Sequence, residues 1–178
     1  AECKGSTLTG IAYEQLLPYV KPDGKAFVAV AGDFVSTEDG TGIVHIAPTF
    51  GADDFRTAKQ QGISAILVTD EGGNPSPLVD KRGRFVKEVT DFAGEYVKEE
   101  YLTTNEKEAE RQKQGRDKYL SVDERIAIKL KQENKAFKVE KYEHNYPHCW
   151  RTDKPVLYYP LDSWFIRTTA CKDKMIAL

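Results

Sequence analysis

The feature that most constrains this chain is a stretch in which a glycine turn leads into an apolar segment and then an acidic helix start, residues 40–54 (GTGIVHIAPTFGADD). Gly40 and Gly42 can adopt the positive backbone angles that a tight turn needs. Ile43–Ala47 is rich in β-branched residues and is followed by a proline, which predicts a short buried strand. Because side chains alternate along a strand, we expect His45 to point into an apolar wall.

The end of this stretch predicts a helix over Ala52–Gln61, terminated by Gly62. Asp53 and Asp54 would occupy its first turn, where acids complement the helix dipole. A lone histidine and first-turn acids are most often structural. Here, however, a strand end, a proline turn and a helix N-terminus follow one another, which brings His45 and Asp54 to one edge of a sheet. A carboxylate at that edge would bind an ammonium group.

Other segments predict β structure. Ala26–Ala31 is nearly continuously apolar and is expected to form a hairpin with Ile43–Ala47, while Ile63–Val68 predicts a third strand. Glycines and prolines occupy half of residues 70–77, so we expect a surface loop without regular structure there. That loop lacks the spacing and the Lys-Ser or Lys-Thr of a phosphate-binding loop.

Two further helices are predicted in the second half of the chain. Residues 105–114 are almost wholly charged and polar, which predicts a solvent-facing helix or an inserted loop. Ser121 and Glu124 have the spacing of a capping box, which predicts a helix from there to about Glu133. Helices interspersed among short strands indicate the α+β class.

The C-terminal part predicts extended structure and no metal site. Pro155–Pro160 and Leu161–Ile166 are expected to form paired strands that leave an exposed aromatic pair, Trp164 and Phe165. Zinc needs about four ligands, usually from two separated pairs. Thr152 stands where a cysteine would complete such a pair, and no second pair follows the cluster His144, His148 and Cys149.

Composition narrows the class of protein. The 178 residues carry 26 Lys and Arg against 28 Asp and Glu, so no global basic field marks a nucleic-acid binder and any contact with RNA must be local. The 3 cysteines are widely spaced, which argues against a disulfide framework and fits a reducing cytosol. No apolar run approaches the roughly 20 residues of a membrane span, so we expect a soluble, cytoplasmic protein.

Three motifs together resemble the editing insertion of the isoleucyl-tRNA synthetases, which are class I aminoacyl-tRNA synthetases. They are GTGIVHIAPTFGADD at residues 40–54, PHCWR at 147–151 and DSWF at 162–165. The valyl and leucyl enzymes share the GTG opening and a following proline, but they do not resemble this chain at His45 or at Phe50-Gly51. The resemblance covers most of the chain.

The resemblance implies both a fold and a parent enzyme. The expected fold is α+β, with a barrel-like mixed β core and peripheral helices. Residues 1–143 would form the editing domain core, and residues 144–178 would return toward the catalytic domain, with Trp150-Arg151 packing and pinning the crossing. The parent would attach isoleucine to tRNA(Ile) with ATP and Mg²⁺. This chain lacks the HIGH and KMSKS type signatures of the ATP site, so we expect no cofactor in it.

The resemblance also assigns roles to residues. Asp54 would bind the α-ammonium group of a misattached valine, and His45 would line the pocket and reject larger side chains. Asp53 would have the lesser, dipole-complementing role. The glycine turn would let backbone amides approach the terminal adenosine. The substrate-binding set implied in this way is Gly40, Thr41, Gly42, Phe50, Gly51 and Asp53.

A basic stretch, Lys81–Lys87, would contact the phosphates of the tRNA acceptor end through Arg82, Arg84 and Lys87, although a solvated edge is the simpler interpretation.

One departure from the family is evident. Its editing pockets also use a threonine-rich strand upstream of this region, and nothing in residues 1–9 matches that strand. We therefore expect the isolated chain to hydrolyse Val-tRNA(Ile) poorly.

Three alternatives stay open. A valyl or leucyl type of editing domain would remove threonine or other amino acids, and position 45 argues against it. A non-catalytic tRNA-binding module is supported only by the basic stretches. An unrelated metal hydrolase is the third.

Overall fold

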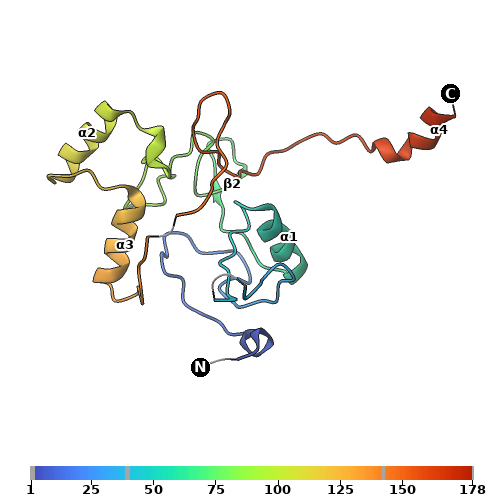
Figure 1. Cartoon of the computed structure of the whole chain (residues 1–178), viewed down its shortest axis with the longest axis horizontal. Coiled ribbons are helices and arrows are strands. Elements are labelled where there is room, and N and C mark those ends of the chain that lie inside the picture. The colour runs from blue at the N-terminus through green and yellow to red at the C-terminus, as the bar shows by residue number, and fades with distance from the viewer. Residues whose placement is uncertain (1–2, 39–40, 142, 178) are drawn as a thin grey trace.

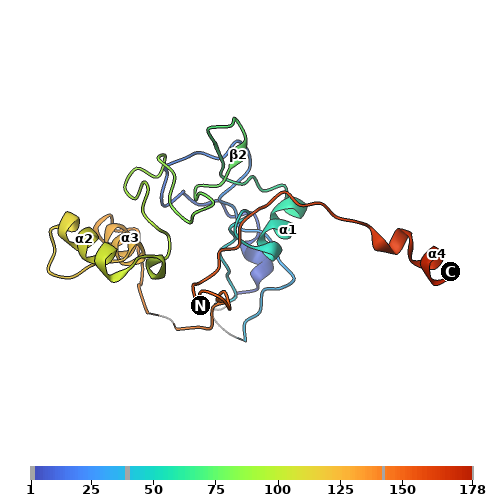
Figure 2. The same cartoon turned by 90° about the horizontal axis from the view of Figure 1, so that it is seen from above.

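The computed structural model describes residues 3–38, 41–141 and 143–177. Helices α2 and α3 lie on one side of the molecule and α1 on the other, with irregular chain between them (Figures 1 and 2). The described elements are η1 (Gly5–Leu8), α1 (Ala52–Gln61), β1 (Val68–Thr69), β2 (Pro75–Ser76), η2 (Glu99–Tyr101), α2 (Thr104–Gln114), α3 (Val122–Gln132), η3 (Thr168–Ala170) and α4 (Lys172–Ile176), where η is a 3-10 helix.

Local sequence signals set the ends of the longer helices. Gly62 caps α1 in the left-handed conformation, with φ of 64°, and its N–H donates to the Ala58 carbonyl. Ser121 and Glu124 form the predicted capping box at the start of α3, because each side chain accepts a hydrogen bond from the other residue's backbone N–H. The predicted bounds of these two helices are confirmed. Thr103 caps α2 in the same way, which sequence reasoning missed.

The β structure is much smaller than predicted. The one sheet of the described residues is an open antiparallel pair, β1 and β2, in which Val68 lies opposite Ser76. Its β2 strand falls inside residues 70–77, where no regular structure was expected, and the predicted strand Ile63–Val68 is reduced to its last residue. The structure is consistent with the α+β class, but its described residues show no barrel-like core.

The predicted hairpin between Ala26–Ala31 and Ile43–Ala47 is wrong. Residues 27–29 pair instead with Ile11–Tyr13: the Ala29 N–H donates to the Ile11 carbonyl, and the Tyr13 N–H donates to the Phe27 carbonyl, each at 2.9 Å. The edge-on contact of the Tyr13 and Phe27 rings accompanies this pairing. Ile43–Ala47 belongs to no described strand. A short apolar run predicts extended backbone without specifying its partner.

The hydrophobic core lies between α3 and the loops that precede α2. Val89, Phe92 and Val122 are almost fully buried, and partly buried apolar side chains surround them. Two ion pairs tie α3 to the same loops: Arg125 to Glu95 at 2.5 Å and Lys129 to Asp91 at 3.0 Å. The surrounding side chains are Tyr19, Leu78, Phe85, Val86 and Ile126.

The end of the chain extends away from the body in both views (Figures 1 and 2). Pro155 forms an isolated bridge with His148, so the predicted pairing of Pro155–Pro160 with Leu161–Ile166 is wrong. Without a partner strand, residues 161–166 have no surface to cover their side chains. Trp164 and Phe165 are fully exposed, as expected. No helix among the described residues has the length and apolarity to cross a membrane.

Candidate functional site

The Asp54 side chain joins the start of α1 to the apolar segment that precedes it. Asp54 lies in the first turn of the helix, as predicted, and its Oδ2 accepts a hydrogen bond from the Ala47 N–H at 3.3 Å. The carboxylate therefore lies across the positive end of the helix, and the residue that it bonds is two positions along the chain from His45. The helix dipole favours a negative group at this position. Asp54 is half-buried, so its side chain is still accessible to solvent.

Gly51, the N-cap residue of α1, leaves the space that this carboxylate occupies. A Cβ atom at position 51 would stand 2.5 Å from Oδ2 and 2.9 Å from Cγ of Asp54. The backbone at Gly51 is extended, with φ of −161°, so its conformation alone does not require glycine. Close packing does. Gly51 was assigned to the site by resemblance, and its geometry gives that assignment a steric reason.

His45 is exposed, which corrects the prediction that it points into an apolar wall. Its neighbours Ile43 and Val44 are 69% and 51% exposed. This segment pairs with no described strand, and its first three residues are exposed, while Ile46 and Ala47 are half-buried. Thr41 precedes it, and the Ile43 N–H donates to the Thr41 hydroxyl at 3.4 Å. Gly42 has the expected positive φ of 74°.

The other residues of the predicted set have separate contacts. Asp53 forms an exposed ion pair with Arg56 one turn along α1, at 3.1 Å, which fits its lesser role. The Phe50 ring meets the Tyr159 ring edge-on at 6.4 Å between centroids, so the chain after residue 144 reaches the site stretch. Gly40 lies outside the described residues.

The basic stretch presents two of its three named cations to solvent. Arg82 and Lys87 are exposed. Arg84 is held by Tyr96: its Nη2 donates to the phenol oxygen at 3.0 Å, and its guanidinium carbon lies 4.4 Å from the ring centroid. That hydrogen bond raises the pKa of Arg84. The Asp80 carboxylate shapes the turn by accepting hydrogen bonds from the Arg82 and Arg84 backbone N–H groups.

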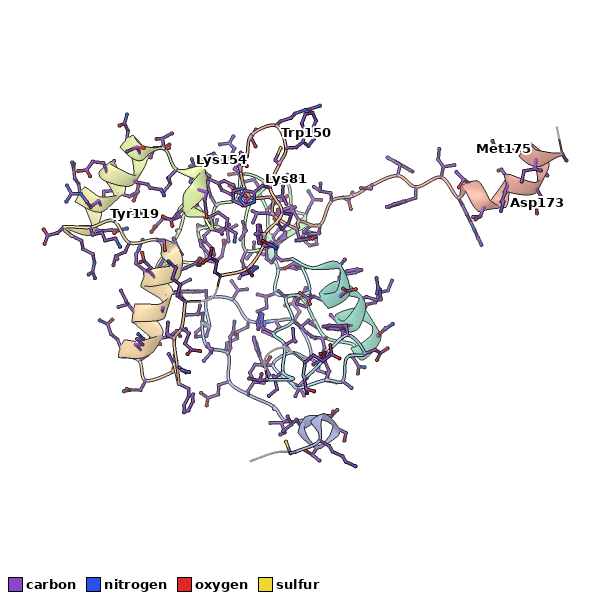
Figure 3. The ribbon with its side chains drawn as sticks, viewed as in Figure 1. Lys81, Tyr119, Trp150, Lys154, Asp173 and Met175 are labelled. Atoms are coloured by element: carbon purple, nitrogen blue, oxygen red, sulfur yellow. The ribbon has the colours of Figure 1, made fainter. Side chains whose placement is uncertain are left out.

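The segment around Cys149 forms a turn and presents an aromatic ring to solvent. The hydrogen bond with the Thr152 hydroxyl, together with backbone N–H groups, lowers the pKa of the Cys149 thiol. Trp150 is 86% exposed at the tip of the loop (Figure 3), and it contacts only Arg151 among the ring contacts of the described residues. Trp150 therefore packs against no other ring of the described residues, and the expectation that Trp150-Arg151 pins the crossing toward the catalytic domain stays a prediction. The described residues hold no cluster of three metal-ligating side chains.

One surface cavity joins residues of the basic stretch to the segment after residue 144. We name it the return groove: it has a volume of about 580 Å³ and lies between the 80–83 turn and residues 154–161. His45 and Asp54 do not line this groove. Sequence reasoning missed the groove, although the tyrosines on both sides of it were a usable signal. Its lining residues are Asp80, Lys81, Arg82, Gly83, Tyr96, Tyr101, Lys154, Val156, Leu157, Tyr159 and Leu161.

Comparison with known proteins shows relatives over nearly the whole chain, although no family model matches it. The isoleucine-tRNA ligase of Cytophaga hutchinsonii is 75% identical over 98% of this chain and 16% of the relative. That of Porphyromonas gingivalis is 51% identical over 99% of the chain and 16% of the relative. That of Thermoplasma volcanium is 40% identical over 97% of the chain and 14% of the relative.

These relatives are ligases of an amino acid and tRNA, so the class to which the chain belongs is that of the aminoacyl-tRNA synthetases. The chain spans no more than 16% of the length of these three relatives. Within the class, it belongs to the isoleucine-tRNA ligase family and corresponds to one segment of that enzyme.

Proposed function

We propose that this segment is the editing region of an isoleucine-tRNA ligase and hydrolyses Val-tRNA(Ile), so that valine is not incorporated in place of isoleucine. The observation that carries the proposal is the Asp54 carboxylate, which lies across the N-terminus of α1 and is bonded to the segment that bears His45. A fixed carboxylate of this kind suits the α-ammonium group of an aminoacyl ester.

The need for such a site follows from the small difference in binding free energy between isoleucine and valine. One methylene group distinguishes isoleucine from valine, and a hydrophobic pocket gains only about 1–3 kcal/mol from it. A second site that admits valine, excludes isoleucine and hydrolyses the ester supplies the missing selectivity. In this proposal the imidazole of His45 provides the excluding bulk. Its outer side, exposed here, is covered by another part of the parent enzyme.

Hydrolysis of the ester depends more on the orientation of the reacting groups than on a strong general base. Attack of water on an activated ester needs a well-placed water and donors for the developing oxyanion. Asp54 fixes one end of the ester through its ammonium group, and the glycine turn at residues 40–42 brings backbone amides toward the terminal adenosine. Phe50 and Gly51 shape the space between these two anchors.

The partners in this proposal are the acceptor end of tRNA(Ile) and the catalytic domain of the same synthetase, toward which residues 144–178 return. Arg82 and Lys87, both exposed, contact tRNA phosphates. Arg84 supports the turn instead, because its guanidinium is held by Tyr96. The parent works in the cytoplasm, and its ATP and Mg²⁺ serve the ligation step, which involves no residue of this segment.

Asp54→Ala in the complete parent enzyme tests the proposal. We expect the rate of Val-tRNA(Ile) deacylation to fall about 100-fold, since loss of the ammonium partner misplaces the ester, while attachment of isoleucine is unchanged. Lys59→Ala is the matched control, because it removes an exposed charge from the same helix outside the predicted site, and it should retain the rate. Equal rates for Asp54→Ala and the unaltered enzyme would refute the proposal. Faster hydrolysis of Thr-tRNA(Val) would indicate the valyl type.

A further inference from the structure

Residues 155–160 lie on the body of the molecule with one face inward. Pro155 is buried, Leu157 and Tyr159 are half-buried, and the residues between them are exposed. This is the alternation of an extended chain that lies on a surface. Every described residue after Tyr159 is exposed. Tyr159 is therefore the last described residue whose side chain the body partly covers.

The backbone that carries Tyr159 is anchored a few residues before it. The Tyr101 hydroxyl donates to the Pro155 carbonyl at 2.7 Å, and the Tyr146 hydroxyl donates to the Val156 carbonyl at 2.9 Å. These two bonds fix consecutive peptide groups at the start of the segment. The Tyr159 side chain is thus presented from a fixed backbone.

The Tyr159 ring contacts one residue of the stretch that bears the candidate site. It meets the Phe50 ring edge-on, with 6.4 Å between the centroids and 64° between the planes, and both residues are half-buried. This is a favoured geometry for an aromatic pair, and the attraction comes from the rings themselves. The contact therefore joins two segments that are far apart in the chain without using the Tyr159 hydroxyl.

Phe50 belongs to a turn that also holds the Asp54 carboxylate. The Phe50 N–H donates to the Ala47 carbonyl at 2.9 Å, while the Ala47 N–H donates to Oδ2 of Asp54 at 3.3 Å. Ala47 is thus bonded to both residues. Pro48, inside the turn, has a fixed φ, so the turn is stiff. A displacement of Phe50 would consequently move the N–H group that orients the carboxylate.

The space around this carboxylate tolerates little movement. Phe50 directly precedes Gly51, where even a Cβ atom would stand 2.5 Å from Oδ2 of Asp54. A misplacement of about 1 Å at a reacting group can lower a rate about 100-fold. A ring that holds Phe50 in place therefore bears on the position of Asp54.

We infer that Tyr159 is a positioning residue for the proposed hydrolysis. Its ring holds Phe50, and Phe50 holds the turn that orients the Asp54 carboxylate toward the α-ammonium group of the ester. The chemical consequence rests on the proposed function, whereas the contact and the turn do not. A pair that only added packing would leave the orientation of Asp54 unchanged.

Variants of the complete parent enzyme test the inference. We expect Tyr159→Leu to lower the kcat of Val-tRNA(Ile) deacylation about 3- to 10-fold, the scale of one aromatic pair. KM should not change, because contacts with tRNA phosphates position the substrate. Tyr159→Phe keeps the ring and should keep the rate. Tyr158→Leu is the matched control, because Tyr158 is the neighbouring tyrosine on the outward face and is 56% exposed, and it should also keep the rate.

A double variant tests the route through Phe50. Adding Tyr159→Leu to Phe50→Leu should cause no further loss of kcat, because the ring contact is already absent. Multiplied losses would show that Tyr159 acts independently of Phe50 and would overturn the inference. Losses of kcat in Tyr159→Phe or Tyr158→Leu equal to that in Tyr159→Leu would overturn it as well.

Hydrogen exchange followed by mass spectrometry gives a readout that does not depend on activity. Residues 44–50 should exchange faster in Tyr159→Leu than in the unaltered parent or in Tyr158→Leu, because the Ala47 and Phe50 N–H bonds open more often. Unchanged exchange at these residues, or an equal rise throughout the chain, would contradict the positioning role.

The same set of variants separates the two proposals. A kcat lowered by Asp54→Ala and not by Tyr159→Leu would leave the proposed function in place and end this inference alone. An unchanged kcat in Asp54→Ala would refute the proposed function, and hydrogen exchange would still decide whether Tyr159 holds the turn.

Discussion

The side of the molecule around α3 and the side around α1 are built differently. Around α3, a capping box, two ion pairs to neighbouring loops and the buried Val89, Phe92 and Val122 hold the chain. Around α1, only Thr57 and Ala58 of the helix are buried, and the segment before it pairs with no described strand. The stability of the chain therefore resides on the α3 side, whereas the candidate chemistry lies on the more weakly packed side.

The largest expected difference between the two sides is in packing. Phe92 is only 3% exposed, so Phe92→Ala should lower the free energy of unfolding by about 3–5 kcal/mol. Phe55→Ala on α1 is the matched control, and because Phe55 is 59% exposed its effect should be small. Urea denaturation followed by circular dichroism measures both. Similar losses of unfolding free energy at the two positions would contradict the proposed difference between the two sides.

A second prediction separates function from stability on the α1 side. Gly51→Ala places a methyl group against the Asp54 carboxylate, so we expect deacylation by the parent enzyme to fall about 10- to 100-fold. The free energy of unfolding should change by less than about 1 kcal/mol, since the N-cap backbone is extended there.

Gly62→Ala, at the other end of α1, is the reciprocal control. Its φ of 64° disfavours alanine, while an added Cβ atom would meet nothing within 4 Å. It should therefore cost about 1 kcal/mol of stability and leave the deacylation rate unchanged. Loss of activity in the Gly62 variant, with none in the Gly51 variant, would contradict the steric role given to Gly51.

The smallest expected effect is a pH dependence on the α3 side. Burial, together with the hydrogen bond that Tyr19 donates to Asp91, raises the pKa of Tyr19 from 10.0 to about 12. The folded chain thus favours the protonated phenol, so this contribution to stability is complete below pH 10 and is lost as the pH rises through about 12.

Tyr19→Phe removes that titration. We expect the urea midpoint of the unaltered chain to fall more steeply between pH 10 and 12 than that of the variant. Parallel declines would show that Tyr19 carries no pH-dependent stability and would weaken the link between Tyr19 and α3.

Sequence reasoning predicted the structure correctly where a feature depends on residues that are close together in the chain. Gly62 ends α1, and Ser121 with Glu124 starts α3, because a cap depends on residues within a single turn. The position of Asp54 in the first turn follows from the same local rule.

Sequence reasoning failed where burial or strand pairing depends on residues that are far apart in the chain. Alternation predicted that His45 would be buried, but alternation buries a side chain only when a partner surface covers that face, and no described strand pairs with its segment. The pairing of residues 27–29 with Ile11–Tyr13 and the return groove likewise depend on contacts between segments that no local pattern specifies.

The most direct measurement of the central claim is a crystal structure of the parent enzyme with a non-hydrolysable valyl-adenosine analogue. The account predicts the α-ammonium nitrogen at about 3 Å from the Asp54 carboxylate, the distance of a charge-assisted hydrogen bond, with the valine side chain toward His45. An analogue bound elsewhere, or an Asp54 side chain turned away from it, would contradict the account.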